Sequence, residues 1–266
     1  MSHIQSNEKN KRLMKIINYN VNGLRAAIKK DITQWLSEAA PDVLCMQELK
    51  LQPDQFPVEI FAELGYHSYF SCAVKKGYSG VAILSKTEPK HVEYGMQIAK
   101  YDNEGRFLRA DFDDFSVVSV YHPSGTMGEV RQSFKMTWLD DFLDYVKALE
   151  VAHPNLVLCG DYNIAHEAID IHDPIRNADK SGFLPEEREW MTKFLDAGFI
   201  DSFRYLHPEE QKYSWWSFRA NARNNNKGWR IDYCMVSQPM QSRIKSAEIY
   251  NDATHSDHCP IMIEIA

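Results

Sequence analysis

Several short apolar runs in this chain are bounded at one end by carboxylate, amide or imidazole residues, and this repeated pattern restricts the fold more than any other feature. The runs are rich in Val, Ile and Leu, which favours β-strands. They cover residues 15–19, 42–47, 116–120, 155–160, 231–237 and 259–265. Some alternate apolar and polar residues and others are apolar throughout, which suits two sheets packed face to face.

Helical patterns separate these runs. Residues 32–39, 130–151 and 185–195 carry apolar side chains at three-and-four spacing, and the last segment begins with Pro-Glu-Glu, which favours a helix start. Helices outside and two sheets inside give an α/β fold. We expect a four-layer α/β sandwich, in which helices flank two packed, mostly mixed β-sheets.

Composition limits the class of protein. The chain has 266 residues, 44% of them hydrophobic, which is ample for a large core. Its formal charge of −7 argues against a protein that coats nucleic acid by bulk positive charge. Of its five cysteines, Cys45, Cys159 and Cys234 lie within apolar runs and are expected to be buried and reduced. No apolar run is long enough to span a membrane.

The domain organisation is simple. Residues 1–13 are polar and of mixed charge, so we expect a disordered N-terminal arm. No Pro-rich or Gly/Ser-rich linker interrupts residues 14–266, which we interpret as a single domain.

The polar residues at the ends of the apolar runs are the candidates for chemistry. A scaffold of strands can aim side chains from several ends at one point. Oxygen and imidazole donors without thiolates suit Mg²⁺ or Mn²⁺ better than a structural zinc ion. Taken singly, each aspartate could equally form a turn or a cap. The set comprises Asn20, Glu48, Asp161, Asn163, Asp232, Asp257 and His258.

Eight collinear segments identify the chain by resemblance. Their order and spacing match over about residues 14–265, essentially the whole chain, and resemble the exonuclease III-type apurinic/apyrimidinic (AP) endonuclease family, whose fold is that of the DNase I-like phosphoesterases. The segments are NYNVNGLRA (18–26), CMQELK (45–50), GYSGVAILSK (77–86), VYHPSG (120–125), GDYNIAHEAIDI (160–171), SGFLPEERE (181–189), GWRIDY (228–233) and SDHCPI (256–261).

The resemblance implies a role for each candidate. Asn20, Glu48 and Asp257 would hold the metal, with Glu48 the principal ligand. Asp161 would activate or orient the attacking water and Asn163 would steady it, although these two residues could instead hold a second or migrating metal. His258 would donate to the scissile phosphate, Asp232 would orient His258, and Tyr121 would contact the phosphate or the metal-bound oxygen.

DNA contacts are expected beside this centre. Lysines and arginines near the motifs could form a local basic strip, although most such residues are simply solvated. By resemblance, Trp215 and Trp229 would wall a pocket for a flipped-out deoxyribose that has lost its base. The expected DNA-binding residues are Arg25, Lys30, Arg131, Asn177, Trp215, Arg219 and Trp229.

A few positions depart from the animal-type members of that family. Asn22 replaces an aspartate of those members, and Met127 replaces an arginine. Lys180 replaces an asparagine, Trp215 a phenylalanine and Arg219 a methionine. These differences leave the grip on nicked product and the exonuclease activity open.

The sequence therefore predicts a Mg²⁺-dependent enzyme of DNA base excision repair, with Mn²⁺ as a substitute. It would cut 5′ to abasic sites in double-stranded DNA and also trim 3′ ends or degrade 3′→5′. Alternatives are a mainly 3′→5′ exodeoxyribonuclease, a related phosphoesterase acting on RNA or phosphorylated lipid, and a binding module without activity. We expect an intracellular monomer without an obligate protein partner, cytoplasmic in a bacterium or nuclear in a eukaryote.

Overall fold

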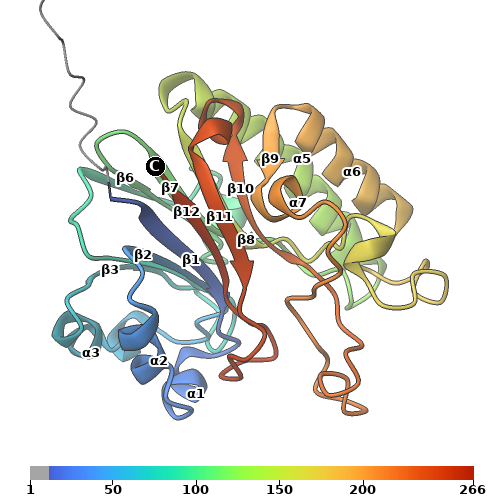
Figure 1. The fold of residues 1–266 in the computed structure, drawn as a ribbon, viewed down its shortest axis with the longest axis horizontal. Coiled ribbons are helices and arrows are strands. Elements are labelled where there is room, and N and C mark those ends of the chain that lie inside the picture. The colour runs from blue at the N-terminus through green and yellow to red at the C-terminus, as the bar shows by residue number, and fades with distance from the viewer. Residues whose placement is uncertain (1–11) are drawn as a thin grey trace, which may run out of the picture.

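The computed structural model describes residues 12–266, and within this range the chain forms two six-stranded sheets (Figure 1). The arm expected over residues 1–13 lies almost wholly outside the described residues. The first sheet has the strand order β11 (Ile244–Ile249), β12 (Ile261–Ile265), β1 (Met14–Asn20), β2 (Val43–Gln47), β4 (Val81–Ser85) and β3 (His67–Ser71). The second has the order β5 (His91–Tyr94), β6 (Phe107–Asp111), β7 (Ser116–Tyr121), β8 (Leu156–Asp161), β10 (Asp232–Ser237) and β9 (Phe199–Asp201).

Both sheets are mixed. β1 runs parallel to β2, and β7 runs parallel to β8, while the remaining neighbours pair antiparallel. Each parallel pair carries polar residues at its carboxyl end, so the pairing brings these residues to one edge of each sheet.

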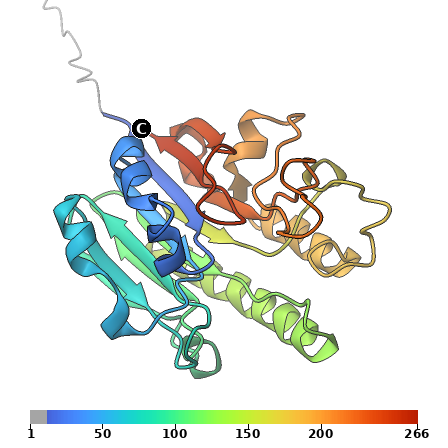
Figure 2. The same cartoon turned by 90° about the horizontal axis from the view of Figure 1, so that it is seen from below.

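Helices cover the outer faces of the two sheets, as Figures 1 and 2 show. The α-helices are α1 (Leu24–Ile28), α2 (Ile32–Ala39), α3 (Val58–Glu63), α4 (Ala99–Asp102), α5 (Glu129–Ala152), α6 (Pro185–Asp196) and α7 (Ser202–Leu206). Short 3₁₀ turns occur at η1 (Pro53–Gln55), η2 (Ala168–Asp170) and η3 (Gln238–Arg243). The predicted four-layer α/β sandwich is confirmed.

Three apolar layers hold the sandwich together. Between the sheets lie Ile16, Val43, Val157 and other side chains from both sheets. A second cluster joins the second sheet to α5 and α6, and a third joins the first sheet to α1, α2 and α3. All five cysteines are free, and Cys45, Cys159 and Cys234 are buried as expected. Within residues 12–266, no helix is long and apolar enough to cross a bilayer.

A buried charge network fixes the segment that leads into β10. The guanidinium of Arg230, which is 1% exposed, lies 2.7 Å from a carboxylate oxygen of Asp170 and 2.7 Å from one of Asp201. Arg204 contacts Asp170 from the other side at 2.5 Å. Burial alone would raise the pKa of Asp170, but Arg230 and Arg204 outweigh it and lower the pKa to about 2.

This network makes part of the stability dependent on pH. Because the pKa of Asp170 is depressed in the folded state, its contribution is present above about pH 4–5 and is lost as the pH falls towards 2. Replacing Asp170 by Asn should reduce the free energy of unfolding, and the difference from wild type should shrink by roughly 1 kcal/mol between pH 6 and pH 3. Urea unfolding at both pH values measures this difference.

Asp113 offers a matched control, since it forms an exposed ion pair with Lys90. Asp113→Asn should change the free energy of unfolding little at either pH. A pH-independent difference between wild type and Asp170→Asn would contradict the assignment.

Candidate active site

The carboxyl ends of the central strands meet at one edge of the two sheets. β1 ends at Asn20 and β2 leads into Glu48, while β8 of the second sheet ends at Asp161. The Asn20 side-chain amide donates to Glu48 Oε1 and to Asp161 Oδ2, at 2.9 Å in each case. One amide group thereby joins the catalytic candidates of both sheets.

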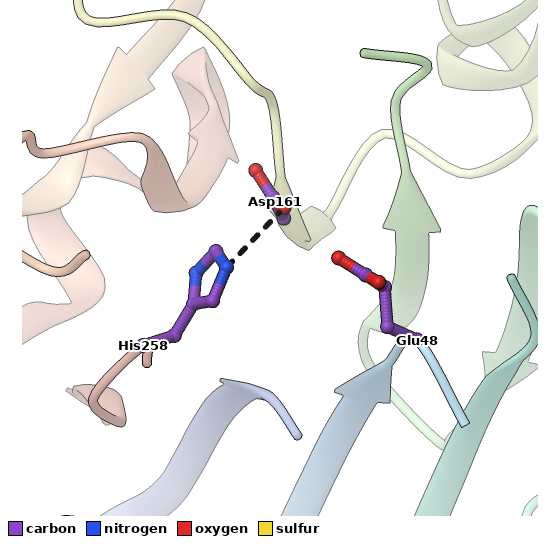
Figure 3. Close-up of side chains that lie close together, drawn as sticks. All are labelled: Glu48, Asp161 and His258. Carbon is purple, nitrogen blue, oxygen red and sulfur yellow. Dashed lines mark ion pairs between the residues drawn. The ribbon is translucent and has the colours of Figure 1, made fainter. Parts of the chain in front are cut away.

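Glu48, Asp161 and His258 converge most closely (Figure 3). One side-chain donor atom from each lies within 4.8 Å of those of the other two. His258 Nε2 lies 3.9 Å from Asp161 Oδ2. This is a group with the spacing of a metal or phosphate site, formed from the end of β8, the residue after β2 and the segment before β12.

Asp161 lies in a setting that disfavours its charge. Burial, helped by the negative charges of Asp232 and Glu48, raises the pKa of the Asp161 carboxyl to about 8. Its two oxygens accept from Asn163, Oδ1 from the backbone amide at 2.8 Å and Oδ2 from the side-chain amide at 3.3 Å. Asp161 is therefore oriented by hydrogen bonds and retains affinity for a proton near neutral pH.

Glu48 behaves differently. Burial would raise the pKa of its carboxyl, but the Lys50 ammonium, 2.8 Å from Oε2, and the Asn20 hydrogen bond outweigh burial and lower the pKa. Glu48 is thus held as an anion beside a carboxyl group with a raised pKa. Two nearby acids with opposite shifts are typical of sites where one group binds a cation and the other handles protons.

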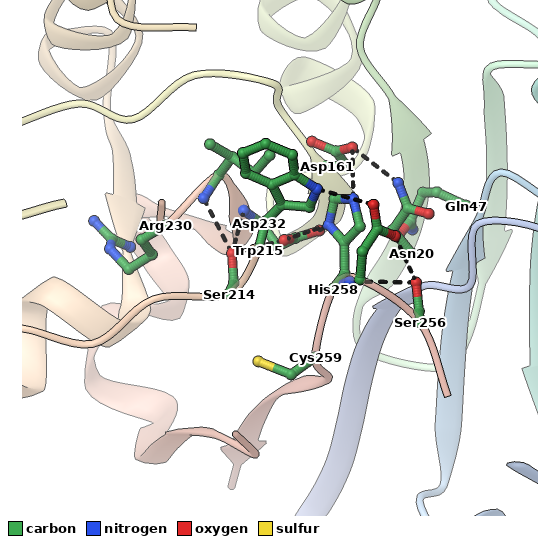
Figure 4. A network of polar contacts seen from close by, with 12 residues as sticks. Asn20, Gln47, Asp161, Ser214, Trp215, Arg230, Asp232, Ser256, His258 and Cys259 are labelled. Carbon is green, nitrogen blue, oxygen red and sulfur yellow. Dashed lines mark hydrogen bonds and ion pairs between the residues drawn. The ribbon is translucent and has the colours of Figure 1, made fainter. Parts of the chain in front are cut away.

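His258 is buried and held by Asp232, the first residue of β10 (Figure 4). Its Nδ1 lies 2.9 Å from Asp232 Oδ2, which also accepts a hydrogen bond from the Ser214 hydroxyl at 2.6 Å. Burial lowers the pKa of His258, but Asp232, Asp161 and Asp257 outweigh it and raise the pKa to about 10. With Nδ1 held by Asp232, His258 favours the imidazolium form, which makes it a hydrogen-bond donor at the site.

Tyr121 lines the same cavity as Glu48, Asp161 and His258. It ends β7, directly opposite Asp161 in the register with β8. The Arg106 guanidinium lies 4.8 Å from the centre of its ring and donates to its carbonyl oxygen at 2.9 Å. Burial, with the charges of Glu48 and Asp161, raises the pKa of Tyr121 well above its usual range, so its hydroxyl stays a donor.

The donor set suits a hard divalent cation. Glu48 and Asp161 supply carboxylate oxygens, and the amide of Asn20 lies between them. Asp257, expected as a third ligand, faces the same cavity, but its oxygens accept from the Asn22 side chain at 2.8 Å and from Trp215 Nε1 at 3.1 Å. Glu48 and Asp257 thus face one cavity, but the group of donor atoms within 4.8 Å of one another consists of Glu48, Asp161 and His258, so the role of Asp257 as a ligand stays a prediction.

A cavity of about 710 Å³ opens on this cluster. Trp215 and Trp229 line it, and their rings stand perpendicular with centroids 6.0 Å apart. Their backbones pair in a short antiparallel bridge, because each amide donates to the carbonyl of the other at 2.9 Å. Gly182 allows the Trp229 ring to approach, since a Cβ atom there would lie 2.8 Å from the ring.

The basic residues expected to contact DNA divide into two groups. Arg25, Lys30 and Arg219 are exposed, and the Lys30 ammonium lies 5.9 Å above the ring of Phe218 in the 217–228 loop. These three side chains are free to meet a phosphate backbone.

Arg131 and Asn177 are engaged within the protein. Arg131 donates to Glu104 Oε2 at 2.8 Å and to the Tyr78 hydroxyl at 2.7 Å. The Asn177 amide donates to the carbonyl oxygens of His172 and Asp173. For DNA contact, both residues would have to exchange or share these bonds, so their expected roles remain predictions.

Comparison with known proteins assigns the family. A model of the Endonuclease/Exonuclease/phosphatase family matches residues 17–258. The chain belongs to this family. Within the family it is a hydrolase of the AP endonuclease and exodeoxyribonuclease III type, a DNA repair nuclease.

Individual relatives are similar over most or nearly all of their length. An exodeoxyribonuclease of Bacillus subtilis is 45% identical over 254 residues, covering 95% of this chain and 99% of the relative. The DNA repair nuclease APEX1 of Danio rerio is 44% identical, covering 95% of this chain and 82% of the relative. The structure of an AP endonuclease from Archaeoglobus fulgidus superimposes with a TM-score of 0.87 at 32% identity, covering 95% and 99% of the two chains.

Several contributors to the site were not predicted from the sequence. Ser214 holds Asp232, Lys50 offsets the charge of Glu48, and Arg106 stacks on Tyr121. Lys50 and Ser214 are close in sequence to the predicted residues Glu48 and Trp215, and this proximity was the only signal in the sequence that they contribute to the site. Arg106 gave none, because its partners come from distant segments.

The Asp232–His258 contact leads to a specific prediction about the pKa of His258. Replacing Asp232 by Asn removes the charge that contributes most to raising the pKa of His258, so that pKa should fall by several units from about 10. An NMR titration of the His258 imidazole in the metal-free protein measures the change. Asp113→Asn, which alters an exposed ion pair with Lys90, is the control variant and should leave the pKa of His258 unchanged. An unaltered His258 pKa in Asp232→Asn would contradict this role for Asp232.

Proposed function

We propose that this protein is a Mg²⁺-dependent DNA repair nuclease that hydrolyses the phosphodiester 5′ to an abasic site in duplex DNA. The products would be a 3′-hydroxyl and a 5′-deoxyribose phosphate. One observation carries the proposal: a cavity walled by Trp215 and Trp229 opens directly on Glu48, Asp161 and His258. The AP endonuclease and DNA repair nuclease among the similar proteins support it.

His258 would bind the scissile phosphate. Its imidazolium, held by Asp232 through Nδ1, leaves Nε2 free to donate to a phosphate oxygen. The protonated hydroxyl of Tyr121 is a second donor. Negative charge on the phosphate oxygens grows in the transition state, so donors fixed beforehand are worth most at that point.

Asp161 would serve the attacking water. Its raised pKa gives it the proton affinity that a general base needs near neutral pH, and Asn163 fixes its orientation. The proton passes from the water to Asp161 as the water oxygen attacks phosphorus. The P–O3′ bond breaks, and the departing 3′ oxygen takes up a proton from solvent to give the 3′-hydroxyl.

Glu48, with Asn20 and Asp257, would hold Mg²⁺, for which Mn²⁺ could substitute, and Asp161 with Asn163 offers a second or alternate site. A divalent cation bound there offsets the phosphate charge and stabilises the departing alkoxide. Because Glu48 is kept ionised by Lys50 and Asn20, it is the residue best prepared to bind a cation.

Pocket shape would select the substrate. A nucleotide without a base loses little stacking and pairing when it flips out of the duplex. The perpendicular tryptophan rings leave room for a deoxyribose without reading any base. The exposed residues Arg25, Lys30 and Arg219 would grip the phosphate backbone, which makes binding sensitive to salt.

A mainly 3′→5′ exonucleolytic enzyme is the second candidate. It is favoured by the 45% identity to an exodeoxyribonuclease of Bacillus subtilis and by the similarity to a 3′-5′ exonuclease (NExo) of Neisseria meningitidis, which has a TM-score of 0.89 and 32% identity and covers 95% and 99% of the two chains. An activity on RNA or phosphorylated lipid is less favoured, because the tryptophan-walled cavity and the exposed basic residues suit DNA. We expect the protein to act inside the cell as a monomer.

Cleavage of an end-labelled duplex carrying one abasic-site analogue tests the proposal. With Mg²⁺ we expect a single product cut 5′ to the lesion, and with EDTA no product. Asp161→Asn should lower the single-turnover rate by about 10²–10⁴-fold, because the water loses its base, while affinity for the duplex is retained.

An undamaged duplex and the Asp113→Asn variant serve as controls. A ladder of shortened strands on both duplexes would put the exonuclease first. Absence of cleavage by the wild-type protein would refute the proposal. A cleavage rate that Asp161→Asn leaves unchanged would refute the role of Asp161.

A further inference from the structure

One ion pair lies wholly inside the protein, behind the cavity. Lys135 of α5 and Glu187 of α6 are both 0% exposed, and the Lys135 ammonium lies 2.5 Å from Glu187 Oε1. Burying two charges costs free energy that their mutual attraction alone rarely repays. The other hydrogen bonds of this pair therefore indicate what it stabilises.

The remaining contact of Lys135 is with the active site. Its ammonium donates to the backbone carbonyl oxygen of Asn163 at 2.8 Å. Asn163 has a φ of 53°, in the left-handed region that asparagine adopts more readily than most residues other than glycine. In that conformation, Asn163 donates to both carboxylate oxygens of Asp161.

Glu187 holds the segment around Gly182, which lines the cavity. Its Oε2 accepts from the backbone amides of Gly182 at 2.6 Å and Leu184 at 3.0 Å. Gly182 lies against Trp229 and accepts a hydrogen bond at its carbonyl oxygen from the amide of Ala165 at 2.8 Å. The segment behind Trp229 and the segment that carries Asp161 are thus tied to the same buried pair.

We propose that Lys135, held by Glu187, is a positioning residue for phosphodiester cleavage, because it keeps the Asn163 backbone in the conformation that orients the Asp161 carboxylate. The inference rests on the function proposed above. Displacing a reacting group by about 1 Å can cost about 10²-fold in rate, so losing this support should impair the chemical step more than DNA binding.

A double variant tests the proposal without leaving a buried charge unpaired. Lys135→Met with Glu187→Gln removes both charges and the donor to Asn163, while the glutamine oxygen can still accept from Gly182 and Leu184. Replacing a buried ion pair by uncharged groups of similar size is often neutral for stability. We expect kcat on the abasic duplex to fall by about 10–10²-fold with KM changed less than about threefold.

Lys147→Met is the matched control. Lys147 lies on the same helix, pairs with Glu150 and donates to the carbonyl oxygen of Ala197, but it has no contact with the active site. Its replacement should leave kcat and KM unchanged. A second double variant, Lys135→Gln with Glu187→Gln, restores a donor near Asn163 and should recover part of the lost kcat, which a purely structural role would not predict.

The outcomes separate this inference from the proposed function. A wild-type protein that cuts no phosphodiester would overturn both. Wild-type cleavage with an unchanged kcat in the Met/Gln variant, or with a rise in KM alone, would overturn the positioning role only. If the Met/Gln variant does not fold, Lys135→Leu with Glu187→Gln takes its place in the comparison with the Gln/Gln variant. A kcat at least 10-fold lower in the variant without a donor supports the positioning role, and equal kcat values in the two variants contradict it.

Discussion

Three carboxylates, those of Glu48, Asp161 and Asp232, lie close together where the two sheets meet, and their mutual repulsion is the constraint to which the rest of the site responds. In a poorly hydrated setting, three neighbouring anions cannot all persist without compensation. The Lys50 ammonium and the Asn20 amide stabilise Glu48, and the His258 imidazolium stabilises Asp232. Asp161 accepts hydrogen bonds from Asn20 and Asn163 and lies near the His258 imidazolium, but burial and the charges of Asp232 and Glu48 outweigh these contacts and raise its pKa to about 8.

The same constraint explains how the site is divided. An ionised Glu48 beside a proton-accepting Asp161 allows one acid to hold a cation and the other to take a proton from water. The two-sheet architecture makes this possible because each sheet contributes one of these acids from the end of a parallel strand. Neither sheet alone would bring both acids to the same cavity.

Much of this arrangement was predictable from the sequence. A strand ending in Asp161 and another followed by Glu48 could be predicted, because apolar β-branched runs mark strands and their ends are visible as polar residues. The helix predicted over 32–39 matches α2, and the one predicted over 130–151 corresponds to α5 (Glu129–Ala152). The strand predicted over 155–160 is displaced by one residue, as β8 (Leu156–Asp161).

The direction of individual side chains could not be predicted. Arg131 has the sequence context of a DNA contact, yet in the folded chain it meets Glu104, a residue 27 positions away. Lys135 has the context of a solvated helix residue, but α6 covers it and provides Glu187. Such pairings depend on how distant segments pack, which no local pattern records.

A structure with Mn²⁺ bound, located by its anomalous scattering, tests the central claim most directly. We expect Mn²⁺ within bonding distance of a Glu48 carboxylate oxygen in the wild-type protein, and weaker or no occupancy in Glu48→Gln under the same conditions. Mn²⁺ bound elsewhere, or equally well in the variant, would contradict the claim that the two sheets converge to build a metal-dependent centre at Glu48.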